Sequence, residues 1–202
     1  MSQQATTRQA ANQQGTIRRA TLGCVLTLSF AAFMATAAKI DDVASHIGFT
    51  LTTRWGQTLQ GRFPHYLGEI VETGDGRRKV HLRLLTRDVV IVGHPTYSRL
   101  TRGNGFFDAA NYPQVEFISD AYPPALLHSG GTLTGTLAIR GIRRREVFLV
   151  SPAACDNPGR DCDVVATGSI DRKDYGMGRW DFALSSQVRF NLRVRVRADG
   201  GA

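Results

Sequence analysis

The stretch VRFNLRVRVR, residues 188–197, decides the fold class of this chain. Apolar side chains stand at every second position from Val188 to Val196, with polar or basic residues between them. A period of two is typical of a β-strand that buries one face and exposes the other. The stretch therefore predicts an amphipathic strand near the carboxyl end of a β-rich domain.

Strand patterns also run through most of the chain before this stretch. The further candidate strands are HIGFTLTT (46–53), GRFPHYLGEI (61–70), KVHLRLLTRD (79–88), LTGTLAIRG (133–141), REVFLVSP (145–152) and DVVATGSIDR (163–172). Glycine-rich turn signals separate them, and no stretch keeps a helical period for more than about two turns. The long connection over residues 94–113 is expected to contain a short helix.

Evenly spaced antiparallel strands of this kind fit either a sandwich or a closed barrel. Closure is favoured because a barrel leaves no exposed edge strand. The pattern therefore predicts an all-β, antiparallel barrel of about eight strands.

The first 38 residues predict a signal peptide rather than a part of this barrel. They contain no Asp or Glu, carry three arginines, and continue as an uncharged run that ends in ATAA (35–38). Basic, apolar and small residues in this order are typical of a cleaved secretory signal. The alternative is an uncleaved membrane anchor, because the run approaches the roughly 17 to 25 residues that span a bilayer. We expect residues 39–202 to form the mature domain and to be periplasmic.

Export changes how the charge is interpreted. The whole chain carries a formal net charge of +8, and without the three arginines of residues 1–38 the remainder carries +5. The remaining basic residues are scattered along strands and turns, which does not favour nucleic acid as a partner. The charge is compatible with transient contact with an anionic membrane surface.

The two cysteines of the mature region predict a disulfide. Cys155 and Cys162 flank Asn157-Pro158-Gly159, a strong turn signal, so their sulfurs can face each other across a loop in an oxidising compartment. A zinc site is disfavoured because this pair supplies two ligands where zinc takes four. We expect no metal site.

Catalytic patterns are weak along the whole chain. The five histidines stand singly, and neither a nucleophile turn nor a phosphate-binding loop is present. The charged stretches RRR (143–145) and DRKD (171–174) are expected to be solvated, so that losing any one of these residues leaves folding nearly unchanged. The sequence therefore predicts no catalytic residue, no enzyme activity and no cofactor.

Several blocks of the chain resemble the YceI-like family of exported polyisoprenoid-binding proteins. They are GRFPHYLGEI (61–70), FFDAANYPQVEFIS (106–119), LTGTLAIRGIRRREVFLV (133–150) and ATGSIDRKDYGMG (166–178), followed by the final alternating strand. The segment DDVASHIGF (41–49) departs from the family pattern because it lacks a proline and shifts the histidine to position 46. The family also lacks a required cysteine pair, so the loop around Cys155 and Cys162 is expected to be a local elaboration.

This resemblance implies an extended, lipocalin-like barrel over residues 39–202 that holds a long-chain isoprenoid lipid in its interior. An apolar tunnel can hold such a chain without charged contacts, since burial is favourable by about 0.8 kcal/mol per methylene. The implied function is carriage or sequestration of a long-chain polyisoprenoid or isoprenoid-quinone-like lipid. Two alternatives are an accessory protein of a membrane redox or stress-response system, and an enzyme that would use a polar cluster built from His46, His65 or Asp174.

Inward-facing positions of the strands and the adjacent turns supply the candidate ligand-binding residues. They are Phe49, Phe63, Tyr66, Phe106, Phe107, Phe117, Leu137, Ile139, Phe148, Tyr175, Met177 and Phe190. Plain core packing is the alternative for each of them. Of the adjacent pair Phe106 and Phe107, one is expected to pack under the end of the barrel and the other to border the tunnel. A homodimer is a further expectation that no pattern selects.

Overall fold

The strand at the carboxyl end of the domain forms as its alternating pattern predicts. In the computed structural model, which describes residues 37–197, β11 runs over Leu184–Val194. Val188 and Phe190 are buried, whereas Arg189 and Asn191, which alternate with them, are exposed. One face of the strand therefore points into the domain and the other toward solvent.

The predicted signal peptide lies outside the described residues except for Ala37 and Ala38. These two residues begin the first strand, β1, which pairs with β4. Signal cleavage after either alanine stays a prediction. Within residues 37–197, no helix is both long and apolar enough to cross a membrane.

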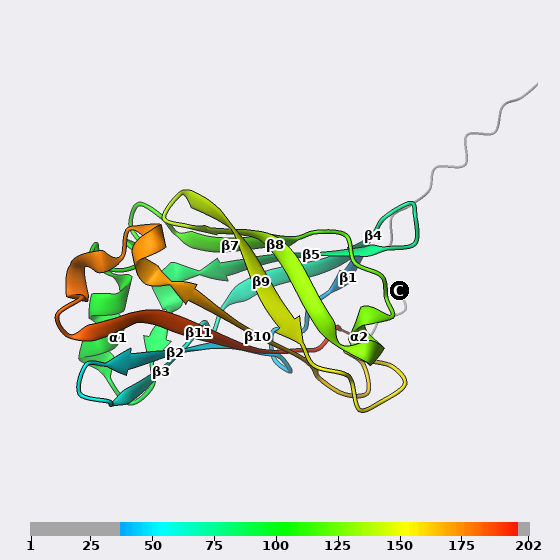
Figure 1. Cartoon of the computed structure of the whole chain (residues 1–202), viewed down its shortest axis with the longest axis horizontal. Coiled ribbons are helices and arrows are strands. Elements are labelled where there is room, and N and C mark those ends of the chain that lie inside the picture. Colours follow the sequence, from blue (N-terminus) through cyan, green and yellow to red (C-terminus); the bar gives the residue numbers. More distant parts are fainter. Residues whose placement is uncertain (1–36, 198–202) are drawn as a thin grey trace, which may run out of the picture. The chain divides into compact units, whose positions relative to one another are not determined.

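Eleven antiparallel strands of the described chain form one sheet, which confirms the predicted all-β class (Figure 1). Before β11, the strands are β1 Ala37–Lys39, β2 His46–Thr53, β3 Thr58–Arg62, β4 Tyr66–Glu72, β5 Arg78–Leu85, β6 Val90–Ile91, β7 Gln114–Ser119, β8 Gly131–Ile139, β9 Ile142–Val150 and β10 Val164–Asp171. Their order across the sheet is β1-β4-β5-β7-β8-β9-β10-β11-β2-β3-β6.

The strand count exceeds the predicted number of about eight because two long strands are each interrupted once. Between β1 and β2 the chain leaves the sheet, and the Asp41 carboxylate accepts hydrogen bonds from the backbone N–H groups of Val43 and Ala44, both at 2.9 Å. Between β3 and β4 stands Pro64, which has no N–H group to donate to a neighbouring strand. The third additional strand is β6, a two-residue strand that pairs with β3.

The sheet closes on itself where residues 39–41 meet residues 195–197. Ile40 donates to the Gly68 carbonyl on one side at 2.8 Å and forms an antiparallel bridge with Val196 on the other. The Asp41 N–H donates to the Arg195 carbonyl, and the Arg197 N–H donates to the Lys39 carbonyl, each at 2.8 Å. These bonds join the β1–β4 edge to the strand that continues β11, so the main strands form a barrel.

Short helices lie in the connections between strands. The predicted helix in the long connection is α1, Pro95–Arg102, with proline in its first turn. A second helix, α2 Leu126–Ser129, precedes β8, and Figure 1 shows α1 and α2 at opposite ends of the barrel. The 3₁₀ turns are η1 Thr86–Asp88, η2 Arg172–Tyr175 and η3 Gly178–Trp180.

Aromatic rings fill the half of the barrel nearer α1. The Phe63 ring lies 5.5 Å from the rings of both Phe49 and Phe107. Phe49 lies flat over Gly61 on the paired strand, where a β-carbon would come within 2.1 Å of the ring. This close approach requires glycine, and it lets the ring fill the lumen at native packing density.

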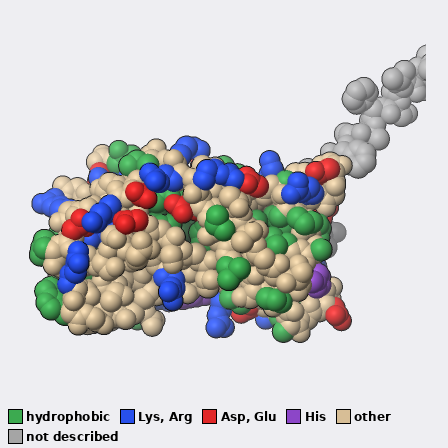
Figure 2. All heavy atoms as spheres, viewed as in Figure 1, with side chains coloured by type: hydrophobic (Ala, Val, Ile, Leu, Met, Phe, Trp, Pro, Cys, Tyr) green, Lys and Arg blue, Asp and Glu red, His purple; other side chains and the backbone are tan. Residues whose placement is uncertain are grey.

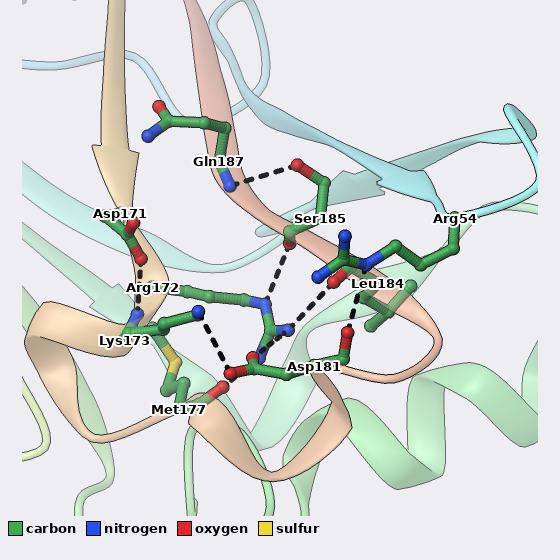
Figure 3. Close-up of polar contacts among 9 residues, drawn as sticks. All are labelled: Arg54, Asp171, Arg172, Lys173, Met177, Asp181, Leu184, Ser185 and Gln187. Carbon is green, nitrogen blue, oxygen red and sulfur yellow. Dashed lines mark hydrogen bonds and ion pairs between the residues drawn. The ribbon is translucent and has the colours of Figure 1, made fainter.

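A buried arginine connects η2 to β11 (Figure 3). The Arg172 side chain has no exposed surface, and its Nε donates to the Ser185 carbonyl at 2.9 Å. Its Nη2 donates to Asp181 Oδ1 at 2.6 Å, and its Nη1 donates to the Met177 carbonyl. The prediction that residues 171–174 are all solvated is therefore wrong for Arg172, because backbone carbonyls and one carboxylate replace water around its guanidinium.

Replacing Arg172 with methionine tests this correction. The variant keeps an unbranched side chain but leaves the carbonyl groups of Met177, Leu184 and Ser185 without this donor, so we expect unfolding to become easier by about 3 kcal/mol. Lys173→Ala is the matched control, because Lys173 is 50% exposed and its bond to Asp181 is a surface ion pair. Urea denaturation of both variants gives the comparison, and equal midpoints would contradict a structural role for Arg172.

Candidate functional site

A cavity of about 340 Å³ occupies the half of the barrel nearer α2. Its wall is formed by Ala38, Ile40, Ile70, Glu72, Arg78, Val80, Leu82, Leu84, Val115, Phe117, Tyr122, Leu126, Leu127, Leu133, Leu137, Phe148, Val150, Pro158, Gly159, Arg160, Val164, Ala166, Phe190, Leu192, Val194 and Val196. Most of these side chains are aliphatic, and a cavity of this size lies within the range of small-molecule sites. The barrel is therefore hollow at one end and filled at the other.

The contrast between the two halves follows from the inward-facing residues of the strands. At the hollow end, β11 and the residues after it present Leu192, Val194 and Val196 to the lumen, and the neighbouring strand β10 presents Val164 and Ala166. At the filled end the same two strands present Val188 and Ile170, which meet the phenylalanine rings near α1. The aliphatic side chains of these strands thus meet phenylalanine rings at the filled end and border open space at the hollow end.

Three phenylalanines form the inner limit of the cavity, and we call them the floor: Phe117, Phe148 and Phe190. The rings of Phe117 and Phe148 lie 4.9 Å apart in an edge-to-face arrangement, and those of Phe148 and Phe190 lie 6.2 Å apart. Gly168 stands on β10 between the last two residues and pairs with both. A β-carbon at Gly168 would come within 2.7 Å of the Phe148 ring, so glycine permits the two rings to meet.

The charged side chains of the wall gather at the outer end of the cavity. Glu72 ends β4, Arg78 begins β5, and the two form an ion pair with Nη2 and Oε1 3.1 Å apart. Arg160 contributes from the disulfide loop. Burial raises the pKa of the nearby Tyr122 phenol, so this group stays neutral on the wall. Charge is therefore confined to the outer end of the cavity.

The loop between Cys155 and Cys162 covers part of this outer end. The predicted disulfide is confirmed, with the two Cα atoms 6.1 Å apart. The Val196 N–H donates to the Gly159 carbonyl at 2.8 Å, and Arg195 donates to the Arg160 carbonyl at 3.1 Å. The extension of β11 therefore holds the loop against the barrel.

The outer surface of this half is partly apolar. Val147 and Leu149 point away from the lumen on β9, and they are 53% and 57% exposed. Figure 2 shows hydrophobic side chains spread over this half of the described surface, with Lys and Arg between them. Apolar and basic groups thus lie on the outside of the same half that contains the cavity.

The candidate ligand-binding residues divide between the two halves of the barrel. Phe117, Leu137, Phe148 and Phe190 are on the cavity wall. The others lie outside it, in the packed half or at its border: Phe49, Phe63, Tyr66, Phe106, Phe107, Ile139, Tyr175 and Met177. Contact of any of them with a ligand stays a prediction, but the structure separates wall positions from packed positions.

The packed candidates have partners of their own. Phe107 contacts the rings of Phe49 and Phe63, whereas Phe106 stacks against Trp180 with the ring centroids 6.5 Å apart. Neither ring of this adjacent pair is on the wall of the 340 Å³ cavity. The Tyr175 hydroxyl donates to Glu146 Oε1 at 2.7 Å. Burial is the larger cause, and this bond the second, of the raised pKa of the phenol.

Sequence reasoning missed most of the aliphatic wall. Val80 and Leu82 belong to an alternating stretch that was recognised as a strand, so alternation alone could have identified them. Leu126 and Leu127 of α2 carry no such signal, because a helix of four residues has no measurable period. Aliphatic side chains, more than aromatic ones, border the open space.

Removing the disulfide should loosen the loop over the cavity. For Cys155→Ser combined with Cys162→Ser, we expect a loss of about 2.5 kcal/mol of folding free energy, because closure of this short loop no longer restricts the unfolded chain. Urea denaturation under non-reducing conditions measures the loss. Asp156→Ser, an exposed change within the same loop, should stay within about 0.5 kcal/mol of the unchanged protein. An unchanged midpoint in the double variant would contradict the role of the disulfide.

Comparison with known proteins assigns the described barrel to a family. The model of the YceI-like domain matches residues 39–197. Among curated proteins, a search found no match to the chain.

Three solved structures share the fold at low sequence identity. BcnA of Burkholderia cenocepacia superposes with a TM-score of 0.65 at 19% identity, covering 79% of this chain and 99% of that chain. A polyisoprenoid binding domain from Saccharophagus degradans, implicated in plant cell wall breakdown, gives 0.60 at 15% identity, covering 81% and 100%. The YCEI protein of Campylobacter jejuni gives 0.53 at 20% identity, covering 69% and 85%. Since the family model spans nearly the whole barrel, the chain belongs to the YceI-like domain family.

Proposed function

We propose that this protein is an exported lipid-binding protein that encloses the tail of an isoprenoid or isoprenoid-quinone-like lipid for carriage or sequestration. The observation that carries the proposal is the 340 Å³ cavity, whose wall is almost entirely aliphatic or aromatic. Its charged residues stand at the outer end only. Such a site suits a ligand with an apolar tail and a polar end.

The physical basis of binding is transfer of apolar surface out of water. Each methylene of a tail that enters the cavity contributes about 0.8 kcal/mol, so several carbons suffice for useful affinity without any charged contact. The ion pair between Arg78 and Glu72 is half exposed and can face a polar head group or water. Burial of the tail therefore supplies the affinity, and the outer end tolerates the head group.

The family and its structures support this ligand class. The Saccharophagus degradans domain with the same fold is a polyisoprenoid binding domain. Because its identity to this chain is 15%, it supports a shared fold, and the choice of an isoprenoid ligand for this chain is our proposal.

Binding without catalysis is favoured by the distribution of polar groups. His46, His65 and Asp174, which could have formed a catalytic cluster, do not lie on the wall of the described cavity. The charged side chains of the wall, Glu72, Arg78 and Arg160, stand at the solvent end. We therefore favour a carrier over an enzyme, and an accessory role in a redox or stress system would use the same binding.

Export to the periplasm is part of the same proposal. The Cys155–Cys162 disulfide fits an oxidising compartment, and the first 38 residues have the composition of a secretory signal. Transient membrane contact and homodimer formation stay predictions.

Filling the cavity from its wall tests the proposed function. Ala166 faces the lumen from β10, so Ala166→Phe places a ring in the space that we assign to the lipid. Native mass spectrometry of protein purified from its own host should detect one isoprenoid lipid per unchanged chain. The variant should bind at least about tenfold more weakly, since displacing two methylenes from the cavity suffices for that loss.

Thr167→Phe is the matched control, because the next residue of β10 pairs with the outward-facing Leu149. It adds the same ring to the outer face and should keep the lipid. A chain that carries no isoprenoid lipid and takes up none when it is supplied would overturn the proposal. Equal occupancy in Ala166→Phe and Thr167→Phe would do the same.

A further inference from the structure

We propose that the cavity limits the length of tail that it encloses to about three isoprene units, because the tail stops at the floor formed by Phe117, Phe148 and Phe190. The inference rests on the proposed function and goes beyond it, because it names the length class of the ligand. It departs from the long-chain ligand that the family resemblance implies. The units of a longer tail beyond about the third would remain outside.

The depth of the cavity follows from the strands that line it. On β5 the wall runs from Arg78 to Leu84, and along β11 and its extension it runs from Val196 to Phe190. Each interval covers six residue steps, which is about 20 Å along the strand. Because the strands of a barrel tilt by about 40° from its axis, this length corresponds to a depth of about 15 Å. Both sides of the barrel therefore give the same depth.

An extended isoprenoid tail can be compared with this depth. An extended chain advances about 1.2 Å per bond, so the four chain bonds of one isoprene unit span roughly 5 Å. About three units therefore fill the cavity from its outer end to the floor. A volume of about 340 Å³ along this depth is enough for one extended chain.

The floor separates this space from the packed half of the barrel. Phe190 is the single residue of the described chain that borders both the large cavity and the small void behind it. That void measures about 20 Å³, which is enough for about one water molecule. Phe49 stands next, with its ring 6.4 Å from that of Phe190.

Packing around the floor resists its displacement. Phe117, Phe148 and Phe190 are 8%, 7% and 4% exposed, and each ring contacts another ring of the floor. Moving Phe190 deeper would push it into Phe49, which lies over Gly61. The void of about 20 Å³ is too small to accept a phenylalanine ring, and the close-packed residues around it leave no further space for such a shift. The tail therefore ends where the rings begin.

Competition between prenyl alcohols of two, four, six and eight isoprene units tests the proposed limit on tail length. The full chain is offered equal mixtures of two lengths in one detergent, and native mass spectrometry counts the bound species. In the unchanged protein, the four-unit alcohol should exceed the two-unit alcohol by at least about tenfold, because about one further unit becomes buried. Six and eight units should bring no further gain.

Two variants move the floor in opposite directions. Phe190→Leu removes the ring between the cavity and the void, and it should raise the ratio of six-unit to four-unit occupancy at least threefold over the unchanged protein. Leu84→Phe adds a ring at the deep end and should lower the ratio of four-unit to two-unit occupancy at least threefold. Because all proteins meet the same detergent, partition of the alcohols into micelles cancels from these comparisons.

Phe63→Leu is the control, because Phe63 is buried but borders neither the cavity nor the void. It removes the same ring and should leave the length preference unchanged, and circular dichroism checks that each variant is folded. If the occupancy of the unchanged protein by prenyl alcohols rose with length up to eight units, the proposed limit on tail length would be overturned and the proposed function would stand. Unchanged preference in both floor variants would also overturn this limit. Failure of every length to bind would overturn the proposed function itself.

Discussion

The contact between the Phe148 ring and the backbone of Gly168 determines where this barrel is filled and where it is hollow. A β-carbon at position 168 would stand 2.7 Å from the ring, so any residue larger than glycine at this position of β10 would push Phe148 away from Phe190. With glycine present, the two rings meet and, together with Phe117, close the lumen at mid-depth. The same arrangement recurs between Phe49 and Gly61, which fixes the next ring behind the floor. Aromatic rings that lie over glycines thus convert a uniform barrel into a packed half and a cavity.

Polar contacts stabilise the two ends of the barrel in different ways. At the packed end, Arg172 is wholly buried and binds backbone carbonyls of the segment that leads into β11. At the hollow end, hydrogen bonds between residues 39–41 and residues 195–197 join the edges of the sheet, and Arg197 pairs with Asp42. The buried guanidinium of Arg172, with its several acceptors, makes the packed end rigid. At the hollow end the pairing is short, and the cavity stays accessible beside it. The stability of the fold and the space for a ligand are therefore provided at separate places.

Alternation along the strands was enough to predict the fold class, because each inward row is set by a period of two residues. It was not enough to locate the cavity. Phe63 and Phe117 look alike in an alternating pattern, yet Phe63 is packed and Phe117 borders open space, because that difference depends on the rings brought in by neighbouring strands. Arg172 was misjudged for a similar reason, since the carbonyl groups that bury it come from residues 177–185. The disulfide was predictable because both cysteines and the turn between them are local in sequence.

The positions of the two ends also determine how a lipid would be oriented under the proposed function. The packed end offers no passage, because the void behind Phe190 is no larger than about one water molecule. A tail must therefore enter from the end where Glu72, Arg78 and the disulfide loop lie, and it must enter with its apolar terminus first. A polar head group then stops among the charged side chains of that end, where it keeps contact with water. This orientation leaves the head group outside the barrel, together with any length of tail that the cavity cannot enclose. The opening that admits the lipid therefore also presents its head group to a membrane or an acceptor.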